Sequence, residues 1–190
     1  MTLHLDLLRH GETEHGGGLR GSLDDALTPL GWQQMQDAVS VGRDWDRIVS
    51  SPLQRCARFA EDLAAKLGVP LHLEADVKEL HFGDWEGLST AQLMATDAEG
   101  LGLFWENPYT FTPPNGEPVK AFSERVTEAI QRLYAAHQGE RVLLICHGGV
   151  MRLLLALARG VPREQLLQVV VGHGERFSLQ VDAQGTLTEV

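Results

Sequence analysis

The sequence predicts an α/β fold, a three-layer α/β/α sandwich in which helices cover both faces of a mostly parallel central sheet. Short apolar runs alternate with segments of helical periodicity along most of the chain. Glycine, or a hydroxyl residue followed by proline, separates many of these segments. Such alternation is typical of a parallel sheet, because each crossover between parallel strands needs a long connection. The 190 residues suit a single domain, 1–190, with an insertion or lid region at about 77–118.

The first half of the chain contains three predicted strands and two predicted helices. Residues 3–8, 47–49 and 71–73 are short apolar runs, which predict strands. Helices are predicted to end at about Gly42 and Leu67. They begin at the pairs Thr28-Pro29 and Ser51-Pro52, which suit the N-cap and the first helical position.

The second half begins with an irregular stretch, residues 77–118, which glycine and proline interrupt repeatedly. Ser89 and Gln92 form a capping-box pattern there, which predicts a short helix. The regular alternation then resumes. Residues 141–146 are the clearest buried strand, with helices expected at 119–137 and 150–158 and further strands at 168–171 and 177–181.

Composition and charge narrow the functional classes. The hydrophobic fraction of 43% and the charged fraction of 22% are ordinary for a globular protein. A formal net charge of −10 argues against non-specific binding to nucleic acid or to an anionic membrane. Cys56 and Cys146 form no Cys-x-x-Cys pair, which favours a reducing compartment. Because no signal peptide or run of about 20 apolar residues is recognisable, we expect a cytoplasmic protein.

Two histidines follow the two strongest predicted strands. Arg9 and His10 end the first strand, and His147 with Gly148 follows the strand at 141–146. Ligands bind outside the carboxyl ends of strands in such sheets, so the two histidines are expected to share one site. An imidazole is a nucleophile near neutral pH, and an arginine fork matches phosphate oxygens. Two unrelated turn histidines remain the alternative.

Other polar residues are candidates for the same site. Arg55 lies early in the helix after the second strand, so its guanidinium is expected to reach the same edge, with Arg58 as a competitor. A carboxylic acid close by would protonate the leaving oxygen of a phosphate ester. The segment 79–87 is rich in acids, and spacing alone does not choose among its four candidates, Glu79, His81, Asp84 and Glu86.

Five motifs in order resemble the histidine phosphatase superfamily, the phosphoglycerate mutase-like proteins. They are Leu8–Glu14, Leu27–Gly31, Ser51–Arg55, Glu79–Gly87 and Cys146–Gly149. The resemblance implies a phosphoglycerate mutase-like fold and a metal-independent phosphomonoesterase. Such an enzyme needs no cofactor and acts on a small phosphorylated metabolite. Small bacterial phosphatases, such as the alpha-ribazole phosphatases of cobalamin biosynthesis, look most similar.

The resemblance also implies a role for each matched residue. His10 is the nucleophile that becomes phosphorylated. Glu79 is the general acid that protonates the leaving alkoxide, and it then takes a proton from the hydrolytic water. His147, Arg9 and Arg55 line the phosphate pocket.

One position departs from the family pattern. Members often carry a phosphate-contacting asparagine where this chain has Gly16. Arg20, or backbone amides of the glycine-rich loop, is expected to take its place, and Gly148 is expected to open the helix amides toward the anion. The roles of His81 and His173 stay open, as does the oligomeric state.

Alternatives from other classes remain. A phosphoglycerate mutase or a broad-specificity sugar phosphatase shares the motifs, although a compact chain has less material to exclude water, which favours hydrolysis. A noncatalytic phosphate-binding protein on this fold would be expected to lack the nucleophile or the acid. A metal hydrolase is disfavoured, since the eight histidines show no His-x-His or His-Glu-x-x-His spacing.

Overall fold

The computed structural model describes residues 1–41 and 44–190. Within them the strands form one six-stranded sheet in the order β3-β2-β4-β1-β5-β6. The first four strands in this order are parallel, whereas β5 runs antiparallel to both β1 and β6. The prediction of a mostly parallel α/β fold is therefore confirmed. The strands are β1 (Leu3–Arg9), β2 (Arg47–Ser50), β3 (Leu71–Leu73), β4 (Arg141–Cys146), β5 (Arg176–Val181) and β6 (Leu187–Glu189).

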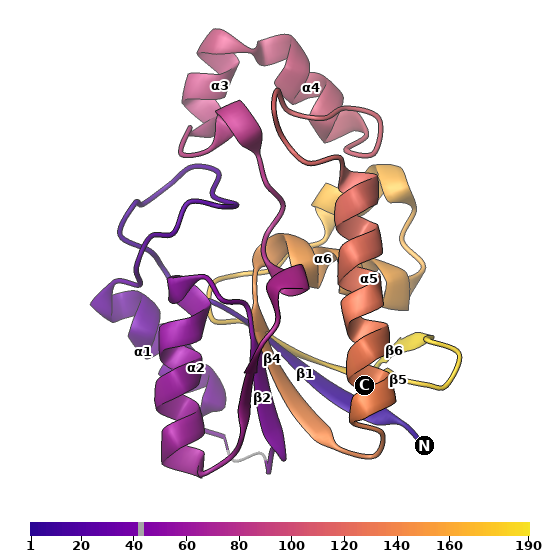
Figure 1. Ribbon diagram of the computed structural model, residues 1–190. Helices are drawn as coiled ribbons and strands as arrows, with labels where there is room; N and C mark the ends of the chain where they lie inside the picture. Colours follow the sequence, from indigo (N-terminus) through magenta and orange to yellow (C-terminus); the bar gives the residue numbers. More distant parts are fainter. Residues whose placement is uncertain (42–43) are drawn as a thin grey trace.

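Helices cover both faces of the sheet (Figure 1). α1 and α2 pack on one face, and α5 and α6 pack on the other. α3 and α4 lie beyond the carboxyl ends of the central strands. The α-helices are α1 (Pro29–Val39), α2 (Gln54–Leu67), α3 (Thr90–Thr96), α4 (Ala98–Glu106), α5 (Val119–Ala136) and α6 (Gly148–Arg159), and the 3₁₀ helices are η1 (Ala75–Val77), η2 (Gly83–Trp85) and η3 (Arg163–Gln168).

The central strand β4 shows why this arrangement forms. Val142 and Leu144 belong to the apolar cluster under α5 and α6, and Leu143 and Ile145 belong to the cluster under α1 and α2. All four side chains are fully buried. A strand buried on both faces needs a continuous apolar run, and β4 has one.

The start of α2 differs from the prediction. Ser51-Pro52 does not open the helix, which begins at Gln54 after Leu53 as its N-cap. The N-cap of α1, Thr28, accepts from the N–H of Gly31 as predicted. At Ser51 the hydroxyl instead forms a buried hydrogen bond with a distant residue, described below. The predicted end of α1, residue 42, lies outside the described residues, and α1 itself ends at Val39.

The strand predicted at 168–171 is wrong. The segment leaves η3 and continues without a strand partner, although Val169 and Val171 are buried. Their carbonyl oxygens accept hydrogen bonds from Arg152 Nε at 3.0 Å and from Arg9 Nη1 at 2.6 Å. Arginine side chains thus replace a neighbouring strand. The helix α4 and the strand β6 were not predicted.

The segment 77–118 carries a cluster of aromatic rings beneath α3 and α4. Trp85 stacks on Phe111 at a centroid distance of 5.6 Å and meets Phe104 edge-on at 5.8 Å. Both Trp85 and Phe104 are buried. In the part of the chain that the structure describes, no helix combines the length and apolar character needed to cross a bilayer.

Candidate active site

The histidines at the two strand ends lie side by side. β1 and β4 are adjacent and parallel, with Arg9 in register with Cys146, so His10 and His147 leave the sheet at the same level. Their ring centroids are 5.4 Å apart, and the ring planes are inclined by 61°. The two residues are only 2% and 0% exposed. The structure therefore places both imidazoles at one edge of the sheet.

One hydrogen bond orients the ring of His10. Its Nδ1 lies 2.8 Å from the carbonyl oxygen of Gly11. A carbonyl oxygen only accepts, so Nδ1 carries the proton and Nε2 keeps its lone pair. Burial lowers the pKa of His10 well below its usual value, and the positive charge of Arg55 lowers it further. The neutral ring presents Nε2 as a nucleophile.

His147 is held by a serine from another strand end. Its Nε2 lies 2.8 Å from Oγ of Ser51, which follows β2 and is fully buried. Burial lowers the pKa of His147 well below its usual value, and the charges of Arg55 and His10 act in the same direction. The free protein therefore keeps both imidazoles neutral, and the positive charge of the site comes from guanidiniums.

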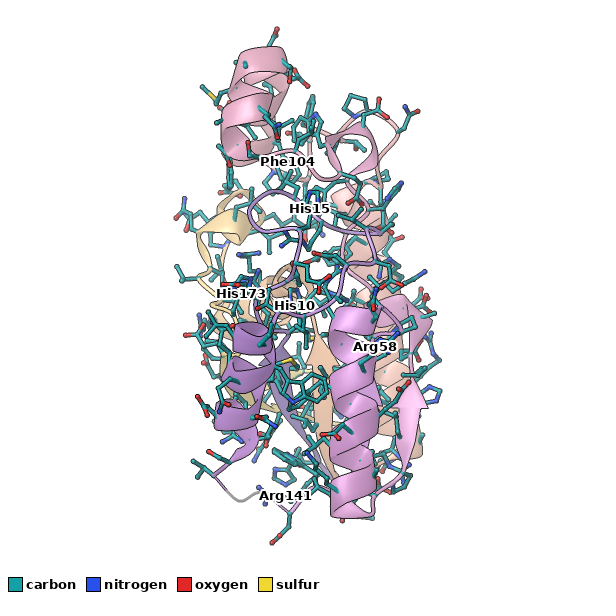
Figure 2. All side chains as sticks on the ribbon, turned by 90° about the vertical axis from the view of Figure 1, so that its left-hand side faces the viewer. His10, His15, Arg58, Phe104, Arg141 and His173 are labelled. Carbon is teal, nitrogen blue, oxygen red and sulfur yellow. The ribbon has the colours of Figure 1, made fainter. Side chains whose placement is uncertain are left out.

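The arginine of α2 that reaches the site is Arg55. Its side chain is fully buried, and its Nη1 and Nη2 donate to the carbonyl oxygens of Leu23 at 2.6 Å and Gly21 at 2.9 Å. Its Nε is buried without a hydrogen-bond partner among the described residues, so one donor is left for a ligand. Arg58 instead lies on the outer side of α2, where it is exposed (Figure 2).

Arg9 packs against the N-terminus of α6. Its Nη1 donates to the carbonyl oxygen of Val171, and its Nε is buried and unpartnered within the described residues. A Cβ on Gly148 would lie 3.1 Å from Nε and Cζ of Arg9, so glycine allows this approach. The first turn of a helix also attracts anions through its free N–H groups. Arg9 and Gly148 thus border one positively charged corner.

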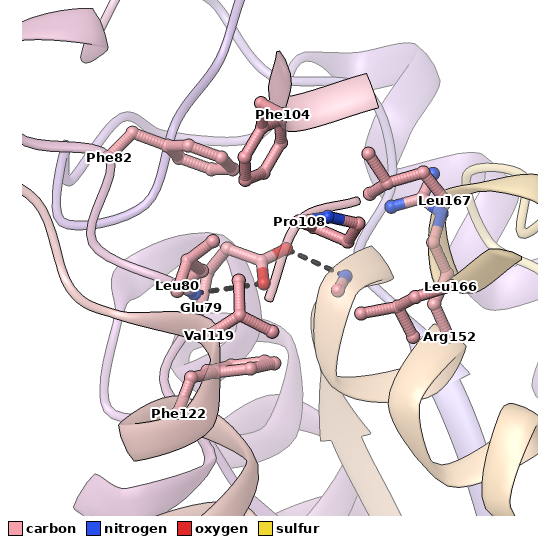
Figure 3. A pocket seen from close by; sticks show the side chains of 11 residues that line it. Glu79, Leu80, Phe82, Phe104, Pro108, Val119, Phe122, Arg152, Leu166 and Leu167 are labelled. Carbon is pink, nitrogen blue, oxygen red and sulfur yellow. Dashed lines mark hydrogen bonds between the residues drawn. The ribbon is translucent and has the colours of Figure 1, made fainter. Parts of the chain in front are cut away.

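The carboxylate of Glu79 reaches the same helix start. Its Oε2 accepts from the N–H of Gly149 at 2.9 Å, and its Oε1 accepts from the N–H of Leu80 at 3.0 Å. A Cβ on Gly149 would overlap Oε1 of Glu79, so this contact requires glycine. One helix N–H that we expected to face an anion is therefore occupied by Glu79 (Figure 3).

The other three candidates of the segment 79–87 are engaged elsewhere. Glu86 accepts from the N–H of Gly21 at 2.7 Å, which ties two loops together. Asp84 accepts from the amide of Asn115 at 3.1 Å. His81 is exposed, and its Nδ1 lies 3.2 Å from Glu86. Of the four candidate acids, only Glu79 is thus shown to contact the start of α6 among the described residues. The sequence spacing alone did not distinguish it from the other three.

Arg20 holds the glycine-rich loop. Its Nη2 donates to the carbonyl oxygen of Gly16, and its Nε lies 3.2 Å from the carboxylate of Asp25. Gly16 has a φ of 73°, the left-handed region that glycine adopts without strain. Burial, the charge of Arg9 and then that of Arg20 lower the pKa of His173. Arg20 therefore lies near the mouth of the site, and its contact with phosphate stays a prediction.

A third imidazole borders the mouth. The ring centroid of His173 lies 5.8 Å from that of His10, and His173 is exposed. Figure 2 labels both residues, which lie next to each other in that view. The N–H of Gly174 donates to the carbonyl oxygen of His10 at 3.3 Å. This bond ties the loop after Val171 to the nucleophile, so His173 is well placed to contact a bound ligand.

The thiol of Cys56, which lies beside the site, is held in its unreactive protonated form. Cys56 Sγ lies 3.8 Å from Nε2 of His147, and burial raises the pKa of this thiol to about 12. Cys56 and Cys146 are both buried and form no disulfide. Within residues 1–41 and 44–190, no group of three or more histidine, cysteine, aspartate or glutamate side chains has the arrangement of a metal site.

Two residues of the site have no role there in the sequence prediction. The sequence predicts a helix cap at Ser51 and no function for Arg152. Nη1 of Arg152 lies 3.1 Å from the point where a Cβ on Gly148 would stand, as do atoms of Arg9, so the two guanidiniums adjoin each other. Arg152 follows Gly148 by four residues, which is one helical turn, and this spacing was a usable signal.

Comparison with known proteins agrees with this geometry. The Histidine phosphatase superfamily (branch 1) matches residues 5–189. The Adenosylcobalamin/alpha-ribazole phosphatase of Escherichia coli (strain K12) is 32% identical over 176 residues, covering 90% of this chain and 87% of that protein. The Glucosyl-3-phosphoglycerate phosphatase of Mycobacterium tuberculosis (strain ATCC 25618 / H37Rv) is 34% identical over 170 residues, covering 83% and 76%.

A solved structure extends the similarity to three dimensions. Bacillus stearothermophilus YhfR matches with a TM-score of 0.91 at 27% identity, covering 99% of this chain and 95% of that one. The family match spans nearly the whole chain, and the named relatives are phosphatases. The chain belongs to the histidine phosphatase superfamily, branch 1, and is a phosphoric monoester hydrolase.

Proposed function

We propose that this phosphatase hydrolyses the phosphomonoester of a small metabolite without a metal ion, through a phosphohistidine formed on His10. The observation that carries the proposal is the hydrogen bond from Nδ1 of His10 to the carbonyl oxygen of Gly11. It leaves the lone pair on Nε2, next to the second imidazole of His147. A neutral, oriented imidazole is the form that attacks phosphorus.

In the first step, Nε2 of His10 attacks the phosphorus atom, and the bond from phosphorus to the ester oxygen breaks. The electron pair of that bond stays on the leaving oxygen. Glu79, protonated for this step, gives its proton to this oxygen, so a neutral alcohol departs. The products are phosphohistidine and the carboxylate of Glu79.

In the second step, water attacks the phosphorus atom of phosphohistidine. The carboxylate of Glu79 takes the proton of the water as the bond between phosphorus and Nε2 breaks. Its hydrogen bonds from two backbone N–H groups suit this anionic form. Inorganic phosphate leaves, and His10 and Glu79 return to their starting states.

Guanidiniums supply the charge that the transferring group needs. Phosphoryl transfer depends mainly on positioning and on positive charge around the equatorial oxygens. Arg9 and Arg55 each keep a buried, unpartnered Nε within the described residues. Arg20, His147 and the N-terminal turn of α6 at Gly148 complete the phosphate pocket in this proposal. No step requires a metal or an organic cofactor.

We further propose one domain over residues 1–190 in which the segment 77–118 acts as a lid. This segment supplies Glu79, and α3 and α4 lie beyond the carboxyl edge of the sheet, where a lid is needed (Figure 1). We also propose that the protein works in the cytoplasm, because its two cysteines form no disulfide.

Alpha-ribazole 5′-phosphate is our first candidate substrate, because the relative named Adenosylcobalamin/alpha-ribazole phosphatase aligns with 90% of this chain. A broad-specificity sugar phosphatase or a phosphoglycerate mutase-type enzyme is the alternative, and the relative named as a glucosyl-3-phosphoglycerate phosphatase keeps it open. A screen of phosphorylated metabolites, comparing kcat/KM values, decides between them. A preference for transfer to a second alcohol over water would indicate a mutase.

The phosphohistidine is tested by trapping. Radiolabelled substrate mixed with the enzyme and quenched in base should leave acid-labile label on the wild-type protein and none on His10→Ala. His72→Ala, a change at an exposed histidine of β3, should label like the wild type. Label that survives in His10→Ala, or turnover that a chelator abolishes, would contradict the proposal.

The acid is tested by a matched pair of variants. Glu79→Gln should lower kcat by about 10²–10⁴, the usual contribution of general acid catalysis. Asp84→Asn, five residues on, should keep kcat within about twofold of the wild-type value, because the Asp84 carboxylate accepts from the side-chain amide of Asn115. Full activity of Glu79→Gln would move the acid to another residue.

A further inference from the structure

We infer that Arg125 of α5 is a positioning residue of the reaction, because it holds the backbone of Glu79 in place for proton transfer. The inference rests on the proposed function, which assigns Glu79 as the acid. Glu79 lies between η1 and η2, in a connection that the structure describes as neither helix nor strand. Such a connection keeps its shape only through bonds to other parts of the molecule. The acid therefore needs an anchor from elsewhere in the fold.

The guanidinium of Arg125 supplies this anchor. Its Nη1 donates to the carbonyl oxygens of Asp76 and Lys78, both at 2.8 Å, and its Nη2 donates to the carbonyl oxygen of Glu79 at 3.0 Å. One side chain thus binds the backbone at the acid and just before it. Because the donors of a guanidinium are fixed in one plane, they also fix these carbonyl groups relative to one another.

Arg125 also holds the far end of the segment 77–118. Its Nε and Nη2 donate to the two carboxylate oxygens of Glu117 at 2.8 Å and 2.9 Å. The N–H of Glu117 in turn donates to the carbonyl oxygen of His81 at 2.8 Å. A bidentate pair of this kind is strong and directional. The two ends of the segment are therefore tied to each other and to α5.

The stretch between these ends lines a cavity beside Glu79. The cavity has about 410 Å³ of empty space, including its open mouth. Phe82 and Phe104 stand on its wall, and other walls come from η3 and the start of α6 (Figure 3). Phe122 of α5 lines it too, and Cζ of Arg125 lies 4.8 Å from the centroid of that ring. Arg125 thus contacts a wall of the cavity as well as the backbone of the acid.

The use of its donors separates Arg125 from the arginines of the phosphate pocket. A guanidinium has five N–H donors, and the five hydrogen bonds of Arg125 use all of them. Arg9 and Arg55 instead each keep Nε without a partner within the described residues. Arg125 has no donor left for an anion, so it acts through Glu79 and not on the substrate.

Two helices therefore hold the acid at two points. The N–H of Gly149 in α6 holds the carboxylate, as Figure 3 shows, and Arg125 in α5 holds the backbone. With the second anchor lost, the carboxylate is no longer kept at a fixed distance from His10. A displacement of about 1 Å can cost about 10²-fold in rate. Loss of Arg125 should therefore weaken proton transfer in particular.

Two esters of different leaving-group basicity test this role. Phenolate is a strong base that needs a proton as it leaves, whereas 2,4-dinitrophenolate leaves without one. Arg125→Gln should lower kcat/KM for phenyl phosphate by about tenfold to 10²-fold and that for 2,4-dinitrophenyl phosphate by less than about threefold. Glu79→Gln should show the same selectivity. Equal losses for both esters in Arg125→Gln would indicate general structural damage and overturn the inference.

Arg125→Lys guards against a variant that does not fold. It keeps the positive charge, but an ammonium with three donors cannot serve the five acceptors of the guanidinium. Its kcat/KM for phenyl phosphate should fall by at least about threefold, again with 2,4-dinitrophenyl phosphate little changed. Full activity of Arg125→Lys on both esters would overturn the inference, and this variant decides alone if Arg125→Gln does not fold.

Arg132→Gln is the matched control on the same helix. Nη2 of Arg132 contacts the carboxylates of Glu74 and Asp76 at 3.3 Å and 2.7 Å, and its side chain is 50% exposed. Because this ion pair is exposed and holds side chains only, kcat/KM for both esters should stay within about twofold of the wild-type values. A selective loss equal to that of Arg125→Gln would deny Arg125 a special role.

A double variant tests whether Arg125 acts through Glu79. When the acid is already absent, removal of its anchor has nothing further to misplace. The kcat/KM of Glu79→Gln/Arg125→Gln for phenyl phosphate should therefore match that of Glu79→Gln within about twofold. Losses that multiply would mean that Arg125 acts independently of Glu79, which would overturn the inference.

The outcomes also separate this inference from the proposed function. Selective loss in Glu79→Gln with no selectivity in Arg125→Gln and Arg125→Lys would overturn the inference and leave the proposed mechanism standing. Equal loss for both esters in Glu79→Gln would contradict the role of Glu79 as the acid, and the inference would fall with it.

Discussion

Ser51 Oγ lies 2.8 Å from Nε2 of His147, although 96 positions separate the two residues in the chain. The bond joins the ends of β2 and β4, which are neighbours in the sheet. It gives one ring nitrogen of a fully buried histidine a partner, and so it holds the ring in place beside His10. The site is therefore assembled from three strand ends.

Removing this hydroxyl should loosen the second imidazole. Ser51→Ala should lower kcat/KM by up to about tenfold, since a neutral hydrogen bond contributes about 0.5–1.5 kcal/mol. Ser50→Ala makes the same change at the preceding buried residue, whose hydroxyl donates to the carbonyl oxygen of Ser51. Ser50→Ala should therefore keep kcat/KM within about twofold of the wild-type value. Steady-state kinetics on one aryl phosphate measures both, and equal losses would deny a special role to Ser51.

A methyl group at Gly149 should displace the acid. The Cβ of Gly149→Ala would overlap Oε1 of Glu79, so the carboxylate must move from the helix start. We expect kcat to fall toward the level of Glu79→Gln, by about 10²-fold or more. Gly102→Ala in α4 has open space around its new Cβ and serves as the control. It should keep full activity and gain up to about 1 kcal/mol of stability, measured by urea unfolding.

The buried histidines should make stability depend on pH. Burial lowers the pKa of His10 and of His147, so below about pH 6.5 the unfolded chain binds protons that the folded protein does not. The free energy of unfolding should therefore be fully present above pH 6.5 and fall as the pH drops below it. Each histidine contributes at most about 1.4 kcal/mol per pH unit.

Urea unfolding at pH 7.5, 6.5 and 5.5 measures this slope. His10→Asn should flatten it below pH 6.5, because one of the proton-binding groups of the unfolded chain is gone. A slope that stays the same in His10→Asn would mean that His10 titrates alike in the folded and unfolded states.

The two thiols should resist alkylation in the native state. Burial raises the pKa of Cys56 to about 12 and that of Cys146 well above its usual value, so thiolate is scarce at pH 8. Iodoacetamide should therefore leave the folded enzyme active and modify both cysteines only after unfolding, as mass spectrometry would show. Rapid alkylation with loss of activity would indicate that the first turn of α2, which carries Cys56, opens.

The strands that carry the site were predictable because their signal is local. β4 is a continuous apolar run and β1 alternates before it turns apolar at Leu7, and the element order implied parallel pairing that brings their ends together. The strand prediction for residues 168–171 was wrong for the opposite reason. Its apolar residues are buried as a strand's would be, but Arg9 and Arg152 supply its hydrogen bonds, and no local pattern encodes a side-chain partner from elsewhere.

The acid shows a second limit of sequence reasoning. Spacing left Glu79, His81, Asp84 and Glu86 equal, because the segment between residues 77 and 89 contains only the three-residue helix η2 and no longer element to orient them. The distinction comes from a contact with the N–H of Gly149, 70 positions away. Ser51 was misassigned for the same reason, since a serine before a proline reads as a cap until its distant partner is known.

In the proposed mechanism, the groups that attack and hold the phosphate and the walls of the cavity beside Glu79 come from different parts of the chain. Strand ends supply His10, Ser51 and His147, whereas residues of 82–122 and of η3 supply most of the cavity walls. Exchanging these wall residues, with Glu79 kept, can therefore change which alcohol is released while the reaction itself continues. A lineage built on this scaffold can diversify its substrates in small steps, without passing through an inactive ancestor.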